Sequence, residues 1–268
     1  MTNNLTASKE HIAKQGVFWI LSDIMAMTKR NLVRYIRLPQ LLIFSTIQPV
    51  MFLLLFAYVF GGAIKTPGNS YINYLIPGII VQTVIFGAMQ TGVGLADDLS
   101  KGLIDRFRSL PMARSAVLAG RTIADSIRNI FVVLLMSGVG YLIGFRVHQP
   151  LSHQLLALGL TILFGFSFSW ISATIGMLVK SVETAQVAGF IWVFPLVFAS
   201  SIFVPVASMP NWLQTWAKIS PITVTVNSVR ALVLGGDVTP ALWHSFMWMA
   251  AILIIFVPLA VNRYRRST

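Results

Sequence analysis

The sequence predicts an all-α polytopic membrane protein. Its 268 residues are 56% hydrophobic and only 10% charged, and their mean hydropathy is +0.77. Soluble domains typically carry about 25% charged residues, so lipid must be the solvent for much of this chain. Long apolar runs separated by basic segments give the same answer, because each run is long enough to cross a bilayer as a helix. Cysteine is absent, which excludes disulfides and thiolate metal sites.

Six apolar runs come close to the roughly 20 residues that a helix needs to cross the hydrocarbon core. Five of them contain no Asp, Glu, Lys or Arg. The third is fully apolar only from about residue 130, and it becomes long enough if Arg121, Asp125 and Arg128 lie at its interfacial end. Their spacing of four and three residues predicts a local ion pair. The six predicted spans are residues 41–64, 74–96, 121–144, 155–179, 185–206 and 242–261.

The distribution of Lys and Arg orients these spans. Of the 20 basic residues, 16 fall in the termini, connections and span ends on one side. Because basic residues are retained on the cytoplasmic side, the sequence predicts a multi-pass protein of the cytoplasmic (inner) cell membrane with both termini cytoplasmic. The scatter of charges, with no single basic block, argues against nucleic-acid binding. The four basic residues on the other side are Lys65, Arg146, Lys218 and Arg230.

A polar tail of residues 1–16 precedes a predicted amphipathic helix over residues 17–38. Apolar residues recur there at helical spacing, cations favour another face, and Pro39 ends the helix. The pattern predicts a helix lying along the cytoplasmic membrane interface. A positive-inside anchor without a protein partner remains the alternative. The cations of this interfacial helix are Lys29, Arg30, Arg34 and Arg37.

The external segment before the last span contains two short stretches, residues 210–219 and 224–234, separated by Ser220 and Pro221. Each has about half the length required to cross the bilayer. Trp212 and Trp216 are four residues apart, share a helical face and suit a membrane interface. The segment is predicted to form a re-entrant or surface-lying helical hairpin, with an ordinary folded external loop as the alternative.

Motifs for catalysis and cofactor binding are missing. The sequence has no Gly-Lys dipeptide, and therefore no GxxxxGK[ST] loop to hold the phosphates of ATP. The HExxH and GxSxG patterns are also absent. We expect no enzyme active site, metal or cofactor in this chain. Since five spans lack charged groups for ion coupling, the energy for any transport would come from another chain.

Some uncharged polar residues lie inside the predicted spans. Such side chains can line a translocation path or bridge helices by hydrogen bonds, and helix packing is the more common reason for their presence. The residues that we consider for a path are Gln48, Gln82, Gln90 and Ser200.

The connection between spans two and three is predicted to hold a short helix. Leu99, Leu103, Phe107 and Leu110 are spaced by four, four and three residues and therefore share one face. Asp97 and Asp98 suit the start of such a helix, and Pro111 its end. An apolar stripe on a charged cytoplasmic helix has to be covered by the bundle itself, by the lipid surface or by a soluble partner.

With these segments in place, the sequence resembles the membrane subunits of type 2 ABC exporters, in particular the daunorubicin/doxorubicin-resistance permease group. The resemblance covers most of the chain, and four segments carry it in the correct order. They are "PQLLIFSTIQPVMFLLLFAYVFGGAI" at 39–64, "YLIPGIIVQT" at 74–83, "DDLSKGLIDRFRSLPMARSAVLAGR" at 97–121, and "FPLVFASSIFVPVASMPNWLQTWAKISPITVTVNSVRAL" at 194–232.

The resemblance implies a six-span permease domain over residues 39–268 that pairs with a second permease copy or paralogue. Two cytoplasmic ATP-binding subunits would hold ATP and Mg. The loop helix and the interfacial helix would face those subunits, and the hairpin would form an external cap. The implied coupling residues are Asp98, Leu99, Leu103, Asp105, Arg106, Phe107, Arg108 and Leu110, and the implied cap residues are Trp212, Trp216, Pro221 and Arg230.

Two functions from different classes follow. The favoured one is the permease subunit of an ATP-driven ABC exporter that moves an amphipathic drug or a lipid-like substrate across the membrane. In that case the chain contacts membrane lipid and an amphipathic small molecule in addition to its protein partners. The alternative is a non-transporting membrane scaffold or assembly factor.

Overall fold

The computed structural model describes residues 17–64, 66, 70–103, 114–179 and 181–266. Within these residues every element is a helix, which confirms the all-α prediction. The helices are α2 (Val17–Arg37), α3 (Pro39–Val59), α4 (Tyr71–Ser100), α6 (Arg114–Leu142), α7 (Leu151–Gly176), α8 (Val182–Phe198), the 3-10 turn η1 (Val206–Ser208), α9 (Asn211–Ile219), α10 (Pro221–Leu234) and α11 (Thr239–Arg266).

Four helices are long and apolar enough to cross a membrane, and they correspond to four of the six predicted spans. They are Tyr71–Ser100, Ser115–Leu142, Leu151–Gly176 and Thr239–Tyr264. The other two predicted spans fall on α3 and α8, whose described apolar stretches, Ser45–Val59 and Val182–Phe198, are shorter. The count of six spans therefore stays a prediction.

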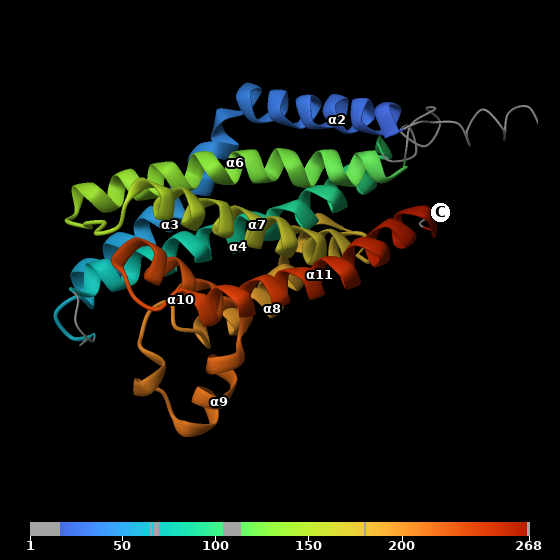
Figure 1. Ribbon diagram of the computed structural model, residues 1–268. Helices are drawn as coiled ribbons and strands as arrows, with labels where there is room; N and C mark the ends of the chain where they lie inside the picture. The colour runs from blue at the N-terminus through green and yellow to red at the C-terminus, as the bar shows by residue number, and fades with distance from the viewer. Residues whose placement is uncertain (1–16, 65, 67–69, 104–113, 180, 267–268) are drawn as a thin grey trace, which may run out of the picture.

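Helix α4 is the centre of the bundle and contacts α3, α6, α7, α8 and α10. The long helices run side by side, with the end of α4, the start of α6 and the C-terminal end of α11 at the same end of the bundle (Figure 1). Helices α4 and α7 approach closely, because a Cβ on Gly92 would lie 2.3 Å from the Ser172 carbonyl oxygen. A Cβ on Gly176 would lie 2.2 Å from the Gly92 carbonyl oxygen.

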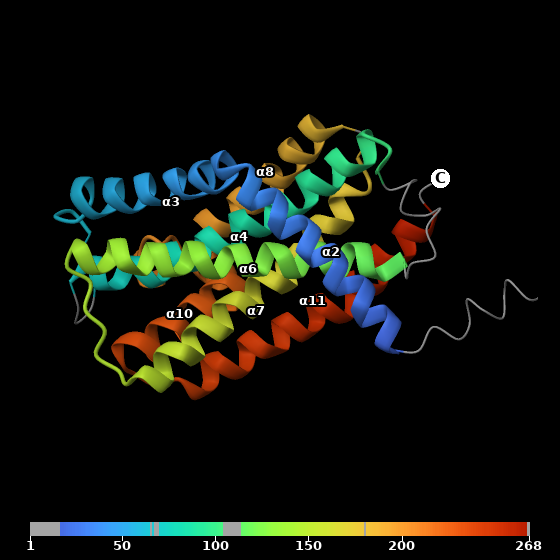
Figure 2. The same cartoon turned by 90° about the horizontal axis from the view of Figure 1, so that it is seen from above.

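Helix α2 lies across α6 at an angle (Figure 2). The crossing is closest at Gly120, where a Cβ would lie 2.5 Å from the Cβ of Met27. Met27 and Asn31 are buried on this side, whereas Lys29 and Arg37 are exposed. The predicted amphipathic helix is present, and its boundary at Arg37 agrees with the expected stop before Pro39.

Two short helices, α9 and α10, occupy the segment that was predicted to form a hairpin, and its re-entrant or surface position stays a prediction. Helix α9 projects away from the bundle and contacts α10 and η1, while α10 packs against α4, α7 and α11 (Figure 1). Trp212 and Trp216 are exposed on α9. Helix α10 begins at Pro221, three residues before the predicted start, because proline at the first helical position has the φ that a helix requires.

Other predicted boundaries are wrong as well. The third span was expected to start at residue 121, but its helix α6 begins at Arg114. The fifth span was expected to run to residue 206, but α8 ends at Phe198 and an apolar turn follows. The loop helix was expected to start at Asp97 and Asp98, but both lie in the last turns of α4, which continues to Ser100. In these last two cases, contacts with distant parts of the chain stabilise the observed helix ends, and the local sequence pattern does not reveal such contacts. Residues 104–113 lie outside the described residues, and they include Asp105, Arg106, Phe107, Arg108 and Leu110.

Candidate functional site

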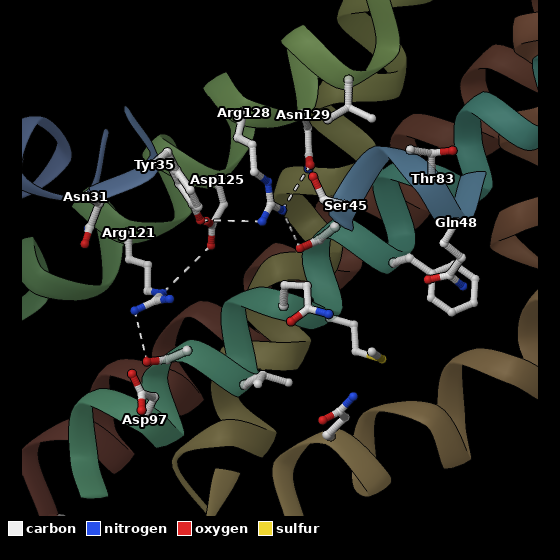
Figure 3. Close-up of a pocket in the computed structure, with 18 of the residues that line it drawn as sticks. Asn31, Tyr35, Ser45, Gln48, Thr83, Asp97, Arg121, Asp125, Arg128 and Asn129 are labelled. Carbon is white, nitrogen blue, oxygen red and sulfur yellow. Dashed lines mark hydrogen bonds and ion pairs between the residues drawn. The ribbon is translucent and has the colours of Figure 1, made fainter. Parts of the chain in front are cut away.

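A cavity of about 410 Å³ lies between α2, α3, α4, α6 and α8 (Figure 3). Its wall has two chemically different parts. One is charged and polar, and the other is apolar and aromatic. The charged part includes Arg34, Asp97, Arg121, Asp125 and Arg128, and the apolar part includes Pro49, Phe86, Met89, Val132 and Phe190.

Two arginines of α6 fit into two glycine notches of α4. Arg121 Nη1 donates to the Gly94 carbonyl at 3.0 Å, and Arg128 Nη2 donates to the Gly87 carbonyl at 2.8 Å. The two arginines are seven residues apart on α6, and the two glycines are seven residues apart on α4. Seven residues are two helical turns, so the spacings match on these antiparallel helices. Glycine leaves room for the guanidinium as it lies here, since a Cβ on Gly94 would lie 1.7 Å from Arg121 Nη2 and the arginine would have to shift. The two arginines therefore reach across α4 into the cavity.

The carboxylates at the end of α4 form ion pairs with arginines of α2 and α6. Arg121 Nη1 lies 2.8 Å from Asp98, Arg30 Nη2 lies 3.4 Å from the same carboxylate, and Arg34 Nη2 lies 3.1 Å from Asp97. Negative charge near a helix C-terminus is unfavourable for the helix dipole. The cations of α2 and α6 offset this cost and tie three helices together. Burial lowers the pKa of the Arg30 guanidinium, and Asp98 opposes that effect.

Asp125 takes its main hydrogen bonds from hydroxyl groups. The Tyr35 hydroxyl donates to Oδ1, and Thr91 Oγ1 donates to Oδ2 at 2.5 Å. Burial raises the pKa of the Tyr35 hydroxyl to about 12, so it remains a protonated donor at neutral pH. The predicted local ion pair with Arg121 is present, with Arg121 Nε 3.9 Å from Asp125 Oδ2. Asp125 therefore belongs to a network between helices.

Arg128 differs from the other cations of the network. Its Nη2 donates to the Gly87 carbonyl and, at 3.2 Å, to Asn129 Oδ1, while Nη1 reaches the Tyr35 hydroxyl at 3.5 Å. No ion pair of Arg128 is found among the described residues. Figure 3 shows its guanidinium between Tyr35 and Asn129 at the cavity wall.

The structure brings together only half of the polar residues considered for a path. Gln48 and Gln90 line the cavity. Gln82 is buried elsewhere in α4, and its Oε1 has no hydrogen-bond partner among the described residues. Ser200 is buried too, and its hydroxyl donates to the Val197 carbonyl at 2.5 Å.

A chain of phenylalanine rings leads away from the cavity along α8. It begins at Phe86 and Phe190 in the cavity wall, and successive ring centroids are 4.3 to 6.3 Å apart. These rings were not predicted as a group from the sequence, although the i, i+4 spacing on α8 was a usable signal. The rings are Phe86, Phe190, Phe194, Phe198, Phe203 and Phe56.

The predicted cap residue Arg230 forms a second buried arginine centre, at the other end of α4. Its Nε donates to the Tyr74 carbonyl at 2.9 Å, and its Nη2 donates to the carbonyls of Ser201 and Ile202 at 2.6 and 3.1 Å. The guanidinium lies 3.6 Å from the centroid of the Tyr74 ring. These bonds hold the turn that follows α8, and Pro221 is buried at the start of α10.

The remaining predicted residues have varied surroundings. Asp98 is 3% exposed and holds the ion pairs described above, so its surface is already covered inside this chain. Leu99 is half-buried at the end of α4 and Leu103 is half-buried beyond it. Among the described residues, no three His, Cys, Asp or Glu side chains gather as metal ligands would.

Comparison with known proteins identifies the family to which this chain belongs. The profile of the ABC-2 type transporter family matches residues 22–234, which include most of α2, the cavity wall and Arg230. The chain belongs to the ABC-2 type transporter family. It is 33% identical over 241 residues to the daunorubicin resistance ABC transporter permease protein DrrB1 of Streptomyces coeruleorubidus, covering 89% of this chain and 84% of the relative.

Two further relatives are also named as ABC transporter permeases. The probable doxorubicin resistance ABC transporter permease protein DrrC of Mycobacterium tuberculosis is 27% identical over 251 residues, covering 92% of this chain and 90% of the relative. The probable multidrug ABC transporter permease YbhR of Escherichia coli is 21% identical over 203 residues, covering 75% and 54%. ABC permeases are multi-pass membrane subunits that are not enzymes themselves, and the family implies an ATP-binding partner subunit.

Proposed function

We propose that this chain is the permease subunit of an ATP-driven ABC exporter, and that it moves an amphipathic drug or a lipid-like substrate across the cytoplasmic membrane. The observation that carries the proposal is the two-sided wall of the cavity, which offers charged groups beside aromatic rings. An amphipathic solute needs both kinds of contact, because burying its polar group without a hydrogen-bond partner is costly. The aromatic chain along α8 supplies an apolar surface that continues from the cavity.

Transport by a reconstituted complex tests this function. The permease and its ATP-binding subunit are placed in lipid vesicles, and ATP-dependent uptake is measured for daunorubicin, the drug in the Streptomyces relative's name, and for a fluorescent phospholipid. Gln90→Trp would fill the cavity and should abolish uptake. Gln154→Trp is the matched control, since Gln154 lines another cavity, between α4, α6, α7 and α10, and uptake should persist. ATP hydrolysis without uptake of either probe would favour the scaffold alternative.

The proposal includes six spans with both termini in the cytoplasm, for which the 16 to 4 division of basic residues is the support. The native chain has no cysteine, so single cysteines report orientation without background. Cys at Asn211, on α9, should react with an impermeant thiol reagent in intact cells. Cys at Ser8 and Ser109 should react only after the cells are opened, and labelling of Ser109 from outside would contradict this topology.

In this proposal ATP and Mg bind to the partner subunit, and residues 99–111 together with α2 dock it, whereas Asp98 is buried within this chain. Phe107 is the largest apolar side chain predicted on the docking stripe. Phe107→Asp should preserve membrane abundance and abolish copurification with the ATP-binding subunit, because a charge would have to be desolvated at the contact. Arg106→Gln is the neighbouring control and should retain copurification. Unchanged copurification of Phe107→Asp would contradict the docking assignment.

A further inference from the structure

Arg128 is a buried cation without a described carboxylate partner. Its exposed fraction is 6%, and its Nε has no hydrogen-bond partner among the described residues. Its other contacts are with the uncharged groups of Gly87, Asn129 and Tyr35. Burying a charge without a counter-charge is expensive, and ionisable groups at such positions are commonly functional.

The charges around the cavity are also unbalanced. Arg34, Arg121 and Arg128 line the cavity together with the carboxylates of Asp97 and Asp125, which leaves an excess of one positive charge in the wall. Arg34 pairs with Asp97, and Arg121 pairs with Asp125 and Asp98. The excess therefore falls on Arg128, which lies one helical turn farther along α6 than Asp125.

We infer that Arg128 binds the anionic head group, a carboxylate or a phosphate, of an amphipathic substrate. The inference rests on the proposed transport function and names the substrate's charge. An oxyanion is the group that a guanidinium binds most strongly, through charge-assisted hydrogen bonds. Phe86 and Phe190 line the same cavity and supply the apolar wall for the rest of the molecule.

A cationic head group has no comparable site in this wall. Asp125 is the buried carboxylate of the cavity, and both of its oxygens already accept hydroxyl hydrogen bonds from Tyr35 and Thr91. Asp97 is paired with Arg34 and Lys101. An amine would have to displace these donors and would also approach Arg128, whereas an anion would complete a coordination that the protein leaves open.

Three probes with the same fluorescent tail separate the head-group charges. They are an NBD-labelled lauric acid, its primary amide and the matching alkylamine. Binding to the permease complex in phosphatidylcholine nanodiscs is measured by fluorescence anisotropy. The wild type should bind the carboxylate about tenfold or more tightly than the amide and the amine, since a charge-assisted hydrogen bond commonly contributes that factor.

Variants assign this preference to Arg128. Arg128→Gln should weaken carboxylate binding about tenfold and leave amide binding unchanged, while Arg128→Lys should keep part of the preference. Arg146→Gln, at an exposed arginine beyond the end of α6, is the control and should bind all probes as the wild type does. If Arg128→Gln does not accumulate in the membrane, the wild type's preference for the carboxylate and the binding measured with Arg128→Lys test the inference instead.

Equal wild-type affinities for the three probes would overturn the inference. A uniform loss for all probes in Arg128→Gln would also overturn it, because the arginine would then only hold α6 to α4. Vesicle uptake separates the two proposals. Preferred binding of the carboxylate without ATP-dependent uptake of any probe would contradict the transport function alone. Uptake of the amine with no preference for the carboxylate would leave transport standing and refute the role of Arg128.

Discussion

The two buried arginine centres, at opposite ends of α4, are built differently. Arg230 is surrounded by fixed dipoles, namely three backbone carbonyls and the side-chain oxygens of Ser201 and Asn227. Arg121 instead combines a backbone carbonyl with the carboxylate of Asp98. Its neighbour Arg128 also lies in the cavity wall, and the Nε of each has no hydrogen-bond partner among the described residues, but only Arg121 has carboxylate partners there.

This difference suits Arg230 to a structural role and Arg121 and Arg128 to roles that change when a ligand binds or a helix moves. A guanidinium whose donors are all taken by uncharged groups of the protein holds those groups in place, and a ligand finds no free donor there. A guanidinium in a network of mobile charged side chains can exchange partners when a charged ligand or a moving helix arrives. We therefore expect substitutions at Arg230 to affect folding and substitutions around Arg121 and Arg128 to affect function as well.

The largest effect is expected for Arg230→Met. The variant removes the arginine donors from the carbonyls of Tyr74, Ser201 and Ile202, of which Ser201 keeps the hydrogen bond from the Tyr74 hydroxyl. The loss should cost about 4 kcal/mol in the free energy of unfolding. Denaturation of the purified protein in detergent measures the loss. Arg146→Met, at an exposed arginine, should change stability by less than about 0.5 kcal/mol. Equal stability of the two variants would show that the turn after α8 holds without Arg230.

The second effect concerns Asp98, which is 3% exposed and compensates Arg121. Asp98→Asn should cost about 3 kcal/mol, because it leaves a buried guanidinium without its closest counter-charge. Removing that guanidinium as well should restore part of the loss, so Asp98→Asn with Arg121→Met should be more stable than the sum of the single changes predicts. Additive losses in this double-mutant cycle would show that the two residues do not interact.

The third effect tests the glycine notch. Gly94→Ala would displace the Arg121 guanidinium, whose Nη2 would lie 1.7 Å from the new Cβ, and should cost about 1 to 2 kcal/mol. Gly138→Ala is the control, since no heavy atom lies within 4 Å of its Cβ position and alanine favours a helix interior by up to about 1 kcal/mol. A stabilised Gly94→Ala variant would mean that Arg121 has a second, equally good position.

The sequence was sufficient for the helices because hydropathy and proline are local signals. The pre-span helix and three of the four long apolar helices were predicted within about five residues, whereas α6 begins at Arg114, well before the predicted start at residue 121. The end of α8 was not predicted either, since Ala199 to Val204 are as apolar as the helix before them. What turns the chain there is Arg230, which is distant in sequence and binds the carbonyls of Ser201 and Ile202.

The candidate site was harder to predict, because its residues come from five helices. Gln48 and Gln90 were identified as polar residues in apolar spans, and both line the cavity. Arg121 and Asp125 were assigned to a local pair, since nothing in their spacing shows that Asp98 and Tyr35 approach them from other helices. The matching seven-residue spacings of two arginines and two glycines were the overlooked signal.

The smallest effect is expected at the outer edge of the network, where Lys101 Nζ lies 2.7 Å from Asp97. The Lys101 side chain is 58% exposed, so water and salt screen the pair and it should contribute about 0 to 1 kcal/mol. Lys101→Gln should therefore change the unfolding free energy by less than Asp98→Asn, and the difference from wild type should shrink as salt is raised. Denaturation at low and high salt measures both quantities. A salt-independent loss as large as that of Asp98→Asn would contradict the distinction between an outer edge and a buried centre, and would make Lys101 part of the charge balance that Arg121 and Arg128 share.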